Sequence, residues 1–565
     1  MNSFNKLDKQ KLISQLEQLY KPYEVAWVFN KIETLQNKYA SKVEFKKGEL
    51  SQKDVILITY GDNVQKKGQP HIKTLQQFVD KYCAPEINGT HILPFYPFTS
   101  DDGFSVKDYF EVDETLGDWE AVENFSKTTK LMFDAVVNHI SKSSNWFKKY
   151  LENDAFYNDF FIDVDPKTDV SKVMRPRALP LLSPFKKSNG SVKNVWTTFS
   201  EDQIDLNYAS PKVFIAVLEV LLFYISKGAK FIRLDAIGFI WKKIGASCIH
   251  LPEAHLIIQL YRAIIETLTQ NVYIITETNV PHQENISYFG NGFNEAQMVY
   301  NFTLPPLLAY SIMKENVSVL TRWAQSLKMP SNKVCFFNFT ASHDGVGVRP
   351  LQGIINDDEI FELAKRAEAH GGRVSYKNNE DGSQSPYELN CNYMDLLSNP
   401  NENDEIRIAK MMLSQSVMLA MPGVPGIYFH SLVGSQNYYQ GIESGINRRI
   451  NREKLDFDTL IQNLNTKGTL RNKLYNLYKK VLAFRVNEEA FNPYAEAVFI
   501  QPSEHLFIIK RTKGGSCFYV VHNFSDNNQK MKALKNNVQD VLTNEIFLDK
   551  QWEFKPYEYK WLKVL

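Results

Sequence analysis

The chain has few cysteines, and their spacing excludes two classes of protein. Its 565 residues include five cysteines, which stand far apart at Cys83, Cys248, Cys335, Cys391 and Cys517. No two of them have the short separation of a zinc-ligand pair or a redox dithiol, and an odd number spread so widely does not indicate a disulfide framework. A reducing compartment is therefore expected, with cytoplasmic localisation as the default.

Long apolar runs and a charge excess of one sign are also missing. No stretch approaches about 18 uncharged apolar residues, the length of a membrane span, and residues 1–19 lack the apolar run of a signal peptide. Lys plus Arg number 65 and Asp plus Glu 64, so the formal net charge is +1. This balance gives no basis for binding nucleic acid or a membrane surface through overall charge.

A glycine-rich phosphate-binding turn is absent after the first predicted strand, which argues against a doubly wound sheet. The chain has instead eight short apolar runs, separated by longer amphipathic stretches such as 211–227 and 254–268. Strands that alternate with helices predict βαβ units and a parallel sheet. Eight units predict an α/β fold, the (β/α)8 or TIM barrel. The runs are residues 55–59, 91–95, 131–137, 231–234, 272–276, 298–302, 334–339 and 426–428.

The remaining segments predict additions to this barrel. Residues 1–50 carry helical patterns at 7–41 and are expected to form an N-terminal helical extension. The catalytic barrel is expected over 51–485, with inserted loop subdomains at about 141–210 and 345–410; inserted loops of this length are usually functional. Alternating apolar and polar residues over 486–565 predict a C-terminal all-β domain.

Polar residues cluster where the predicted strands end. Active sites of TIM barrels lie at the carboxyl ends of the strands, so these side chains are expected to meet at one mouth. Taken singly, each has a structural explanation, such as a helix cap, an ion pair or a hydrogen-bonded structural histidine. Several carboxylates at one mouth are different, because buried like charges are unfavourable unless they are paired or used. The set comprises Asp62, His91, His139, Arg233, Asp235, Glu277, His343 and Asp344.

Paired carboxylates are the chemical groups that glycosyl transfer requires. One attacks the anomeric carbon and the other protonates the leaving oxygen, while a third stabilises the oxocarbenium-like transition state. Arg233, two residues before Asp235, would keep that carboxylate ionised, as a nucleophile requires. Glu277 would need a raised pKa to act as an acid.

The ordered motifs that contain these residues, among them DAVVNH at 134–139, RLDAIGF at 233–239 and SHDG at 342–345, resemble those of the α-amylase superfamily. Within it the chain is similar to the sucrose-phosphorylase branch, through HILPFYPF at 91–98, RPRALPLLSPF at 175–185 and MPGVPGIYF at 421–429. The resemblance implies that Asp235 is the nucleophile, Glu277 the general acid and base, and Asp344 the transition-state stabiliser. It also implies that the glucosyl ring is held by Asp62, His91, His139, Arg233, His343 and Arg448.

Two positions depart from sucrose phosphorylases, which have Tyr four residues after the nucleophile and His two residues after the acid and base. Here these positions hold Phe239 and Asn279, both expected on the acceptor side. The run 276–282 and the N-terminal extension resemble instead glucosylglycerate phosphorylases of the same branch. Glycerate is an anion like phosphate, so one basic pocket would serve both, although arginines in long loops are often only solvated. The predicted members of this pocket are Arg175, Arg177 and the loop 377–390, with Tyr387 and Glu388.

The resemblance thus implies a retaining glycoside phosphorylase that converts 2-O-α-glucosylglycerate and phosphate to α-glucose 1-phosphate and glycerate. Alternatives are phosphorolysis of sucrose, sucrose 6′-phosphate or glucosylglycerol, an α-glucoside hydrolase or transglucosylase, and an amylase-like binding protein. No cofactor is expected, and no metal: Asn138 matches a calcium-ligand position of many amylases, but this branch generally lacks that ion. Small molecules are the expected partners, with neither nucleic acid nor membrane, and a homodimer is left open.

Overall fold

Eight parallel strands form a closed barrel, which confirms the predicted fold class. The structure is a computed structural model that describes residues 6–177, 179–379, 382–532, 534, 537–548 and 551–565. Around the barrel the strands follow the order in which they occur in the chain, and the last one pairs with the first. They are β1 (Ile56–Thr59), β3 (Gly89–Ile92), β4 (Lys130–Ala135), β9 (Ala229–Leu234), β10 (Tyr273–Thr276), β11 (Met298–Tyr300), β12 (Cys335–Phe339) and β16 (Val424–Tyr428).

Strand β3 begins two residues before the run that predicts it. Gly89 lies opposite Ile56 of β1, and a Cβ at this position would stand 2.9 Å from the Ile56 side chain. The close approach of the two strands explains a glycine inside β3. Because glycine and Thr90 add no apolar signal, the sequence pattern misses the start of this strand.

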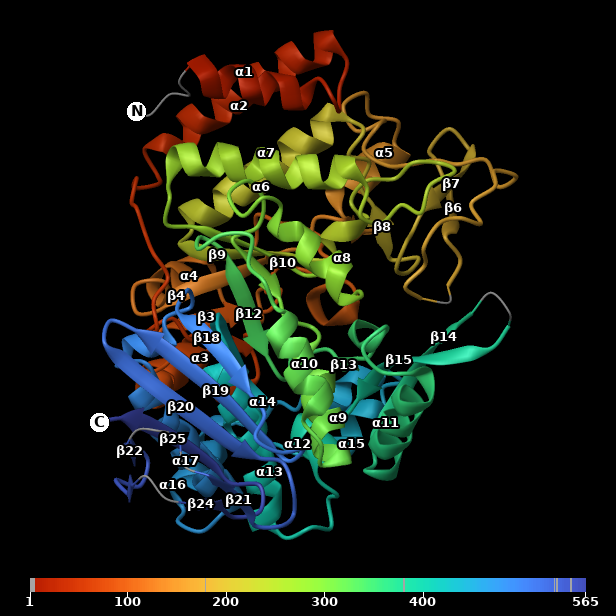
Figure 1. The fold of residues 1–565 in the computed structure, drawn as a ribbon. Helices are drawn as coiled ribbons and strands as arrows, with labels where there is room; N and C mark the ends of the chain where they lie inside the picture. The colour runs from red at the N-terminus through yellow and green to blue at the C-terminus, as the bar shows by residue number, and fades with distance from the viewer. Residues whose placement is uncertain (1–5, 178, 380–381, 533, 535–536, 549–550) are drawn as a thin grey trace.

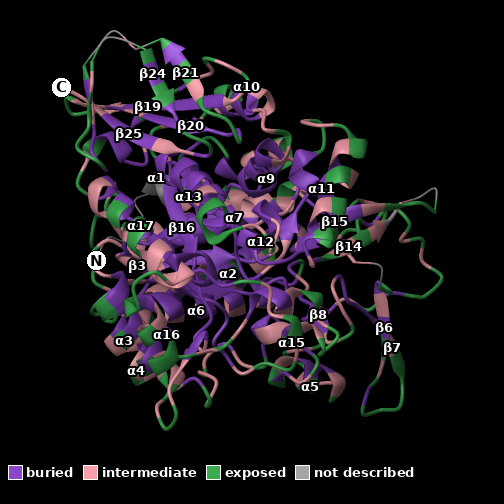
Figure 2. Cartoon of the chain, turned by 90° about the horizontal axis from the view of Figure 1, so that it is seen from below, coloured by how far each residue is buried: buried purple, intermediate pink, exposed green. Residues whose placement is uncertain are grey.

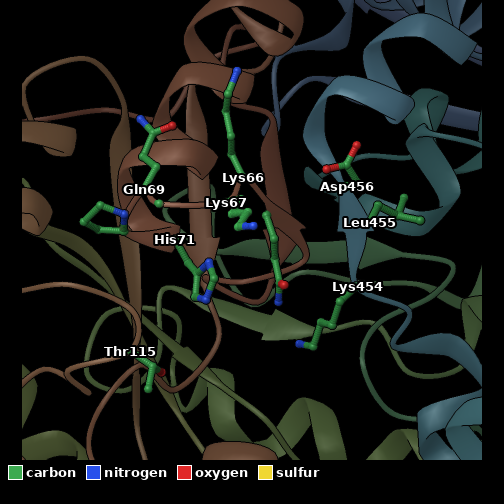
Figure 3. Close-up of a pocket in the computed structure, with 11 residues that line it drawn as sticks. Lys66, Lys67, Gln69, His71, Thr115, Lys454, Leu455 and Asp456 are labelled. Atoms are coloured by element: carbon green, nitrogen blue, oxygen red, sulfur yellow. The ribbon is translucent and has the colours of Figure 1, made fainter.

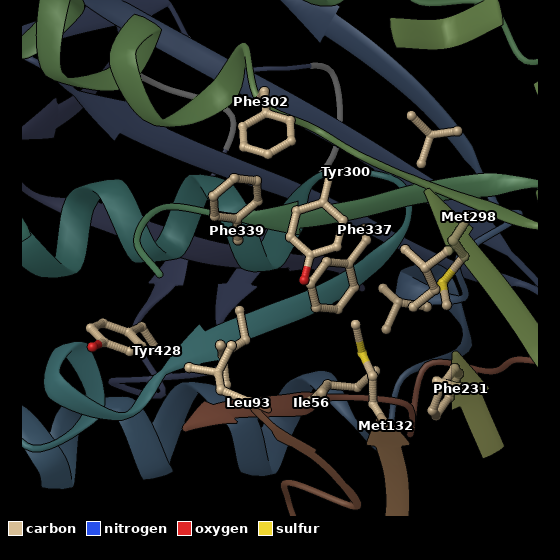
Figure 4. Packing of buried hydrophobic residues seen from close by; sticks show 14 of the residues in the cluster. Ile56, Leu93, Met132, Phe231, Met298, Tyr300, Phe302, Phe337, Phe339 and Tyr428 are labelled. Carbon is tan, nitrogen blue, oxygen red and sulfur yellow. The ribbon is translucent and has the colours of Figure 1, made fainter. Parts of the chain in front are cut away.

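Side chains fill the interior of the barrel, so it is a packed core and not a channel. Met132, Phe231 and Met298 come from β4, β9 and β11 and pack in one cluster with Tyr300 and Phe337 (Figure 4). All five are at most 3% exposed. This core fixes the strand ends, and therefore the backbone positions of the polar residues that follow them.

Helices surround the barrel. In α6 the proline at the first position and the buried apolar face account for the start of the helix and its packing. The helices after the strands are α3 (His71–Phe78), α4 (Trp119–Phe125), α6 (Pro211–Ser226), α7 (Pro252–Leu268), α8 (His282–Ile286), α9 (Leu304–Lys314), α10 (Ser318–Ser326), α13 (Asp404–Ala420), α14 (Phe429–Leu432), α15 (Tyr439–Ile442), α16 (Phe457–Asn465) and α17 (Leu470–Arg485). Two short strands, β2 (Val64–Gln65) and β17 (Leu455–Asp456), pair outside the barrel. In the part of the chain that the structure describes, no helix is both long enough and apolar enough to cross a membrane.

Two N-terminal helices cover the outside of the barrel. They are α1 (Lys6–Leu16) and α2 (Pro22–Ala40), and they lie against α6 and α7 at the top of Figure 1. The Tyr20 hydroxyl donates a hydrogen bond to the Tyr208 carbonyl at 3.1 Å, and Gln15 donates to Gln259 at 2.9 Å. The described part of the extension is therefore attached to the helical layer outside the barrel.

The two predicted insertions each contain a hairpin. The first holds β5 (His139–Ser141), α5 (Asn145–Leu151), β6 (Leu182–Lys186), β7 (Val192–Trp196) and β8 (Gln203–Asp205). The second holds β13 (Val346–Gly347), α11 (Asp357–Ala369), β14 (Arg373–Asn378), β15 (Gln384–Asn390) and α12 (Tyr393–Leu397). Hairpins β6–β7 and β14–β15 project on the same side of the molecule (Figure 1), with more exposed residues than the barrel (Figure 2). The predicted loop 377–390 is thus mostly strand; its residues 380–381 lie outside the described residues.

The C-terminal segment is all-β. A six-stranded sheet and a two-stranded sheet are formed by β18 (Glu496–Ile500), β19 (Leu506–Lys513), β20 (Ser516–Asn523), β21 (Gln529–Lys532), β22 (Val538–Asp540), β23 (Ile546–Phe547), β24 (Gln551–Phe554) and β25 (Tyr559–Val564). Phe507, Phe518 and Trp561 belong to the same buried cluster as the barrel core. Because the core is continuous across residue 485, the domain boundaries at 50 and 485 stay predictions.

Candidate active site

One buried guanidinium organises the carboxylates at the ends of β4, β9 and β10. Arg233, in β9, is 2% exposed. Its Nη1 donates to Asp235 at 2.8 Å and also to Asp134, while its Nη2 lies 3.8 Å from Glu277. Alternation along β9 places Arg233 and Asp235 on the same face of the strand, and the barrel directs that face inwards. An arginine inside the barrel is thus explained by three acidic neighbours.

Asp134 of β4 holds this guanidinium in place. It is fully buried and accepts a hydrogen bond from His91 at 2.6 Å in addition to that from Arg233. Burial alone would raise the pKa of Asp134, but Arg233 and His91 hold it at about 2. Asp134 therefore stays ionised and keeps Arg233 in one orientation.

Glu277 follows β10 and accepts a hydrogen bond from the backbone N–H of Ala236 at 3.0 Å. Ala236 has a left-handed backbone with φ 49°, which turns its N–H towards β10. Burial raises the pKa of both Asp235 and Glu277. Neighbouring carboxylates raise these values further, Glu277 acting on Asp235 and Asp344 acting on Glu277, whereas Arg233 lowers both. Because Arg233 donates directly to Asp235 but lies farther from Glu277, we place the proton of this pair on Glu277.

Asp344 is in the opposite electrostatic state. Its Oδ1 lies 2.7 Å from Nη1 of Arg448 and 3.7 Å from Nη2 of Arg452, and His343 stands 3.5 Å from its other oxygen. Although burial favours the neutral form, Arg448, His343 and Arg452 hold the pKa of Asp344 well below its ordinary value. Arg448 also binds Glu388 of β15 through two hydrogen bonds of 2.9 and 2.6 Å.

The three predicted catalytic carboxylates line one cavity. Asp235, Glu277 and Asp344 reach it from β9, β10 and β12, and both insertions contribute to its walls. Of the other residues predicted from the sequence, seven line the same cavity: His139, His343, Arg448, Asn279, Tyr387, Glu388 and Arg177. The arrangement offers an acid that holds a proton beside an arginine-bound carboxylate, with a permanently ionised carboxylate opposite.

Five predicted residues do not line the cavity. His91 and Arg233 lie beneath it: Arg233 donates directly to Asp235, and His91 acts through Asp134. Phe239 packs edge-on against Phe199, a lining residue, with ring centroids 5.5 Å apart. Arg175 is exposed and donates to the carbonyl of Leu179 at 3.3 Å. The fifth is Asp62, whose position differs most from the prediction.

Asp62 faces another part of the molecule. It is paired with Lys454 and lines a separate hollow with Phe98 and Arg449. Lys454 in turn borders an open pocket with Lys66, Lys67 and His71 (Figure 3). The geometry therefore gives no support for contact between Asp62 and a sugar held by the three carboxylates.

Eight of the residues that line the cavity were not predicted from the sequence, among them Asp101, Phe104 and Gln203. Asp101 accepts hydrogen bonds from Arg177 at 3.0 Å and from Gln203 at 3.3 Å. Phe104 stacks on His343 with centroids 4.8 Å apart and an interplanar angle of 3°. The sequence DDG at 101–103 could have identified Asp101 as a cavity residue. Asp and Gly tolerate the left-handed backbone (φ 54° at Asp101) that directs this side chain into the cavity.

Asn138, the position compared with a calcium ligand, contacts a cation of the protein itself. Its Oδ1 accepts a hydrogen bond from Nζ of Lys242 at 2.8 Å, and the same ammonium lies 2.7 Å from Asp205. The side chains of Lys242 and Asp205 are 2% and 0% exposed. Among the described residues no group of three or more His, Cys, Asp or Glu side chains is arranged to hold a metal ion. The absence of a metal stays a prediction.

Comparisons with known proteins agree with this geometry. A family model described as the catalytic domain of alpha amylase matches residues 85–349. The chain is 42% identical over 558 residues to the glucosylglycerate phosphorylase of Escherichia coli (strain K12), covering 98% of this chain and 100% of the relative. It is 46% identical over 463 residues to that of Spirochaeta thermophila, covering 82% and 78%. The crystal structure of sucrose 6F-phosphate phosphorylase from Thermoanaerobacter thermosaccharolyticum has the same fold, with a TM-score of 0.74, 24% identity and coverage of 84% of this chain and 94% of that one.

Proposed function

The chain belongs to the family of glucosylglycerate phosphorylases within the α-amylase superfamily, and from this premise we propose that it phosphorolyses 2-O-α-glucosylglycerate reversibly. The products would be α-glucose 1-phosphate and glycerate. The observation that carries the proposal is the meeting of Asp235, Glu277 and Asp344 in one cavity with Arg233 between the first two. The proposed partners are these small molecules, and the proposed compartment is the cytoplasm.

In the first half-reaction, Asp235 attacks the anomeric carbon and forms a covalent glucosyl-enzyme. Glu277 donates its proton to the glycerate oxygen as the glycosidic bond breaks. Positive charge develops on the sugar ring, and the ionised Asp344 stabilises it. Arg233, fixed by Asp134, holds Asp235 in position for the attack.

In the second half-reaction, phosphate replaces glycerate beside Glu277, which is now deprotonated. A phosphate oxygen attacks the anomeric carbon, Glu277 accepts the proton of the phosphate, and Asp235 leaves. Two inversions give net retention of the α configuration, and a retaining mechanism requires the two carboxyl groups to lie about 5–5.5 Å apart. Metal and cofactor are not needed for either step.

A panel of four α-glucosides tests the proposal. The purified protein is incubated with phosphate and 2-O-α-glucosylglycerate, sucrose, sucrose 6′-phosphate or glucosylglycerol, and α-glucose 1-phosphate is measured. We expect release from glucosylglycerate at least about tenfold faster, in kcat/KM, than from the other three, because a site that pairs with a substrate group discriminates strongly against substrates that lack it.

The outcomes of this panel separate the alternatives. Fastest release from one of the other glucosides would reject glucosylglycerate as the substrate. Free glucose formed at equal rates with and without phosphate would indicate a hydrolase. No turnover of any glucoside, with no further change in Asp235→Asn, would indicate a binding protein.

A further inference from the structure

Arg349 is a buried cation without a partner. It is 9% exposed, and within the described residues no hydrogen bond or ion pair engages its guanidinium. Other arginines around the cavity differ in having a counter-charge: Arg233, Arg448 and Arg452 each pair with carboxylates. A buried charge without a counter-charge is unfavourable, so Arg349 needs an explanation that the two half-reactions do not provide.

The backbone places Arg349 beside the acceptor side of the cavity. It follows β13, in which Gly347 pairs with Glu388, and the N–H of Val348 donates to the Tyr387 carbonyl at 3.1 Å. Gly347 is in contact with Asn279, since a Cβ at this position would stand 2.3 Å from the Asn279 amide nitrogen. Both Tyr387 and Asn279 line the cavity. Arg349 therefore starts from a turn held against two acceptor-side residues.

Among the described residues, no carboxylate forms an ion pair with Arg349. Burial is the main cause of the lowered pKa of His250 and Lys377 and of the raised pKa of Tyr387, and the guanidinium of Arg349 acts on all three, favouring a lower pKa, so they lie within its electrostatic reach. The nearby carboxylates are already engaged, Glu388 by Arg448 and Asp101 by Arg177. Only Nε of Arg349 is both fully buried and unpaired, so its terminal nitrogens retain access to solvent. Arg349 is not among the residues that line the cavity between the three carboxylates, but Tyr387, on which its guanidinium acts, is one of them.

Asn279 supplies a second unsatisfied group. Its Oδ1 is buried without a hydrogen-bond partner, and it lies two residues after Glu277. An acceptor that carries both an anionic group and a hydroxyl would complement the pair: the anion for the guanidinium and the hydroxyl as donor to Oδ1. Glycerate carries both groups.

We propose that Arg349 binds the carboxylate of the glycerate group and thereby selects anionic over neutral acceptors. This inference rests on the proposed function and specifies its acceptor site. A guanidinium binds a carboxylate through two parallel hydrogen bonds, which gives both affinity and orientation. Before the acceptor binds, the same guanidinium is unpaired, as the structure has it.

The test uses α-glucosyl fluoride as donor, because fluoride leaves without a proton and contains neither phosphate nor carboxylate. Fluoride release in the absence of acceptor reports formation and hydrolysis of the glucosyl-enzyme, and transfer to D-glycerate reports the acceptor site. For Arg349→Gln we expect kcat/KM for glycerate to fall about 10- to 100-fold, the range for lost hydrogen bonds to a charged group. Fluoride release should stay within about twofold. Arg349→Lys should retain part of the transfer to glycerate, because it keeps the charge.

Arg322→Gln is the matched control, since Arg322 is an exposed arginine on α10 outside the cavity, and it should change neither reaction. Equal losses of fluoride release and glycerate transfer in Arg349→Gln would mean a structural role and overturn the inference. Unchanged transfer to glycerate would overturn it as well. If the wild-type protein does not transfer glucose to glycerate, the proposed function fails, and the inference fails with it. A failure limited to the variant leaves the proposed function standing.

Discussion

At the scale of single residues, the site depends on how one arginine divides two carboxylates. Arg233 donates to Asp235 and stays 3.8 Å from Glu277, so two buried acids with raised pKa values take different roles. Difference in environment, rather than in residue type, makes one a nucleophile and the other an acid. The left-handed Ala236 directs its N–H to Glu277, and this hydrogen bond lowers the pKa of the acid against the effect of burial.

Glu277→Gln should separate the two roles. The variant cannot protonate the glycerate oxygen, so phosphorolysis of glucosylglycerate should fall about 10²- to 10⁴-fold. Formation of the glucosyl-enzyme from α-glucosyl fluoride should change much less, because fluoride needs no acid. In the wild type, the rate of glucosyl-enzyme formation from glucosylglycerate should fall as the pH rises through the raised pKa of Glu277.

Stopped-flow measurement of fluoride release and of glycerate release checks these two expectations. Asp235→Asn is the control, and it should abolish the release of both products. Equal loss of both reactions in Glu277→Gln would contradict the assignment of the acid.

Cavity residues that directly follow strands were predicted from the sequence more completely than cavity residues on loops. Asp235 and Glu277 directly follow β9 and β10, so the position of the strand determines the position of the carboxylate, whereas Asp344 lies in the loop after β12 and was found through its motif. Asp62 and Asp101 are both acidic residues on loops, and only the path of the backbone decides which one reaches the cavity. That path depends on a left-handed turn at Asp101, which strand periodicity does not contain.

At the scale of elements, both insertions are held to the barrel by charged contacts, of which the first is fully buried. The first is held through Lys242, whose ammonium joins Asn138, between β4 and β5, to Asp205 of β8. The second is held through Arg448, which joins Glu388 of β15 to Asp344. Apolar periodicity finds strands and helices but not such contacts, which is why the sequence predicted two loops where the structure has ordered hairpins.

Replacing Lys242 should loosen the first insertion. Lys242→Met leaves Asp205 buried without its counter-charge, which costs about 3–5 kcal/mol in the free energy of unfolding. Chemical denaturation of the variant measures this loss. Lys243→Met is a matched control, because the side chain of Lys243 is 65% exposed, and it should stay within about 0.5 kcal/mol of the wild type. Similar losses in the two variants would contradict a buried tether.

At the scale of the whole molecule, the core is continuous from the N-terminal helices to the C-terminal sheet. His522 of β20 lies at one of these junctions, 3.0 Å from the Ser416 hydroxyl of α13. Arg511 of β19 donates to the carbonyl of Ala420 at the end of the same helix. The sequence predicted the barrel and the sheet but not how they join, because the contacts come from residues about 100 positions apart.

Buried histidines should make this molecule sensitive to acid. Burial lowers the pKa of His343, His430 and His522 to about 3 each, against about 6.5 in the unfolded chain. Their stabilising effect is complete above pH 6.5 and is lost as the pH falls from 6.5 towards 3, by up to about 1.4 kcal/mol per pH unit for each histidine. Urea denaturation at several pH values should show this slope, and His522→Asn should reduce it; an unchanged slope in the variant would contradict neutral burial of His522.

The ammonium at Asn138 has a consequence for how the protein can be handled. A counter-ion that is part of the chain does not dissociate on dilution and cannot be removed by a chelator. Reagents that acylate or carbamylate amines could abolish it, but only after the surrounding backbone opens, since the side chain is 2% exposed. The rate at which this amine becomes labelled would therefore report how often the first insertion detaches from the barrel.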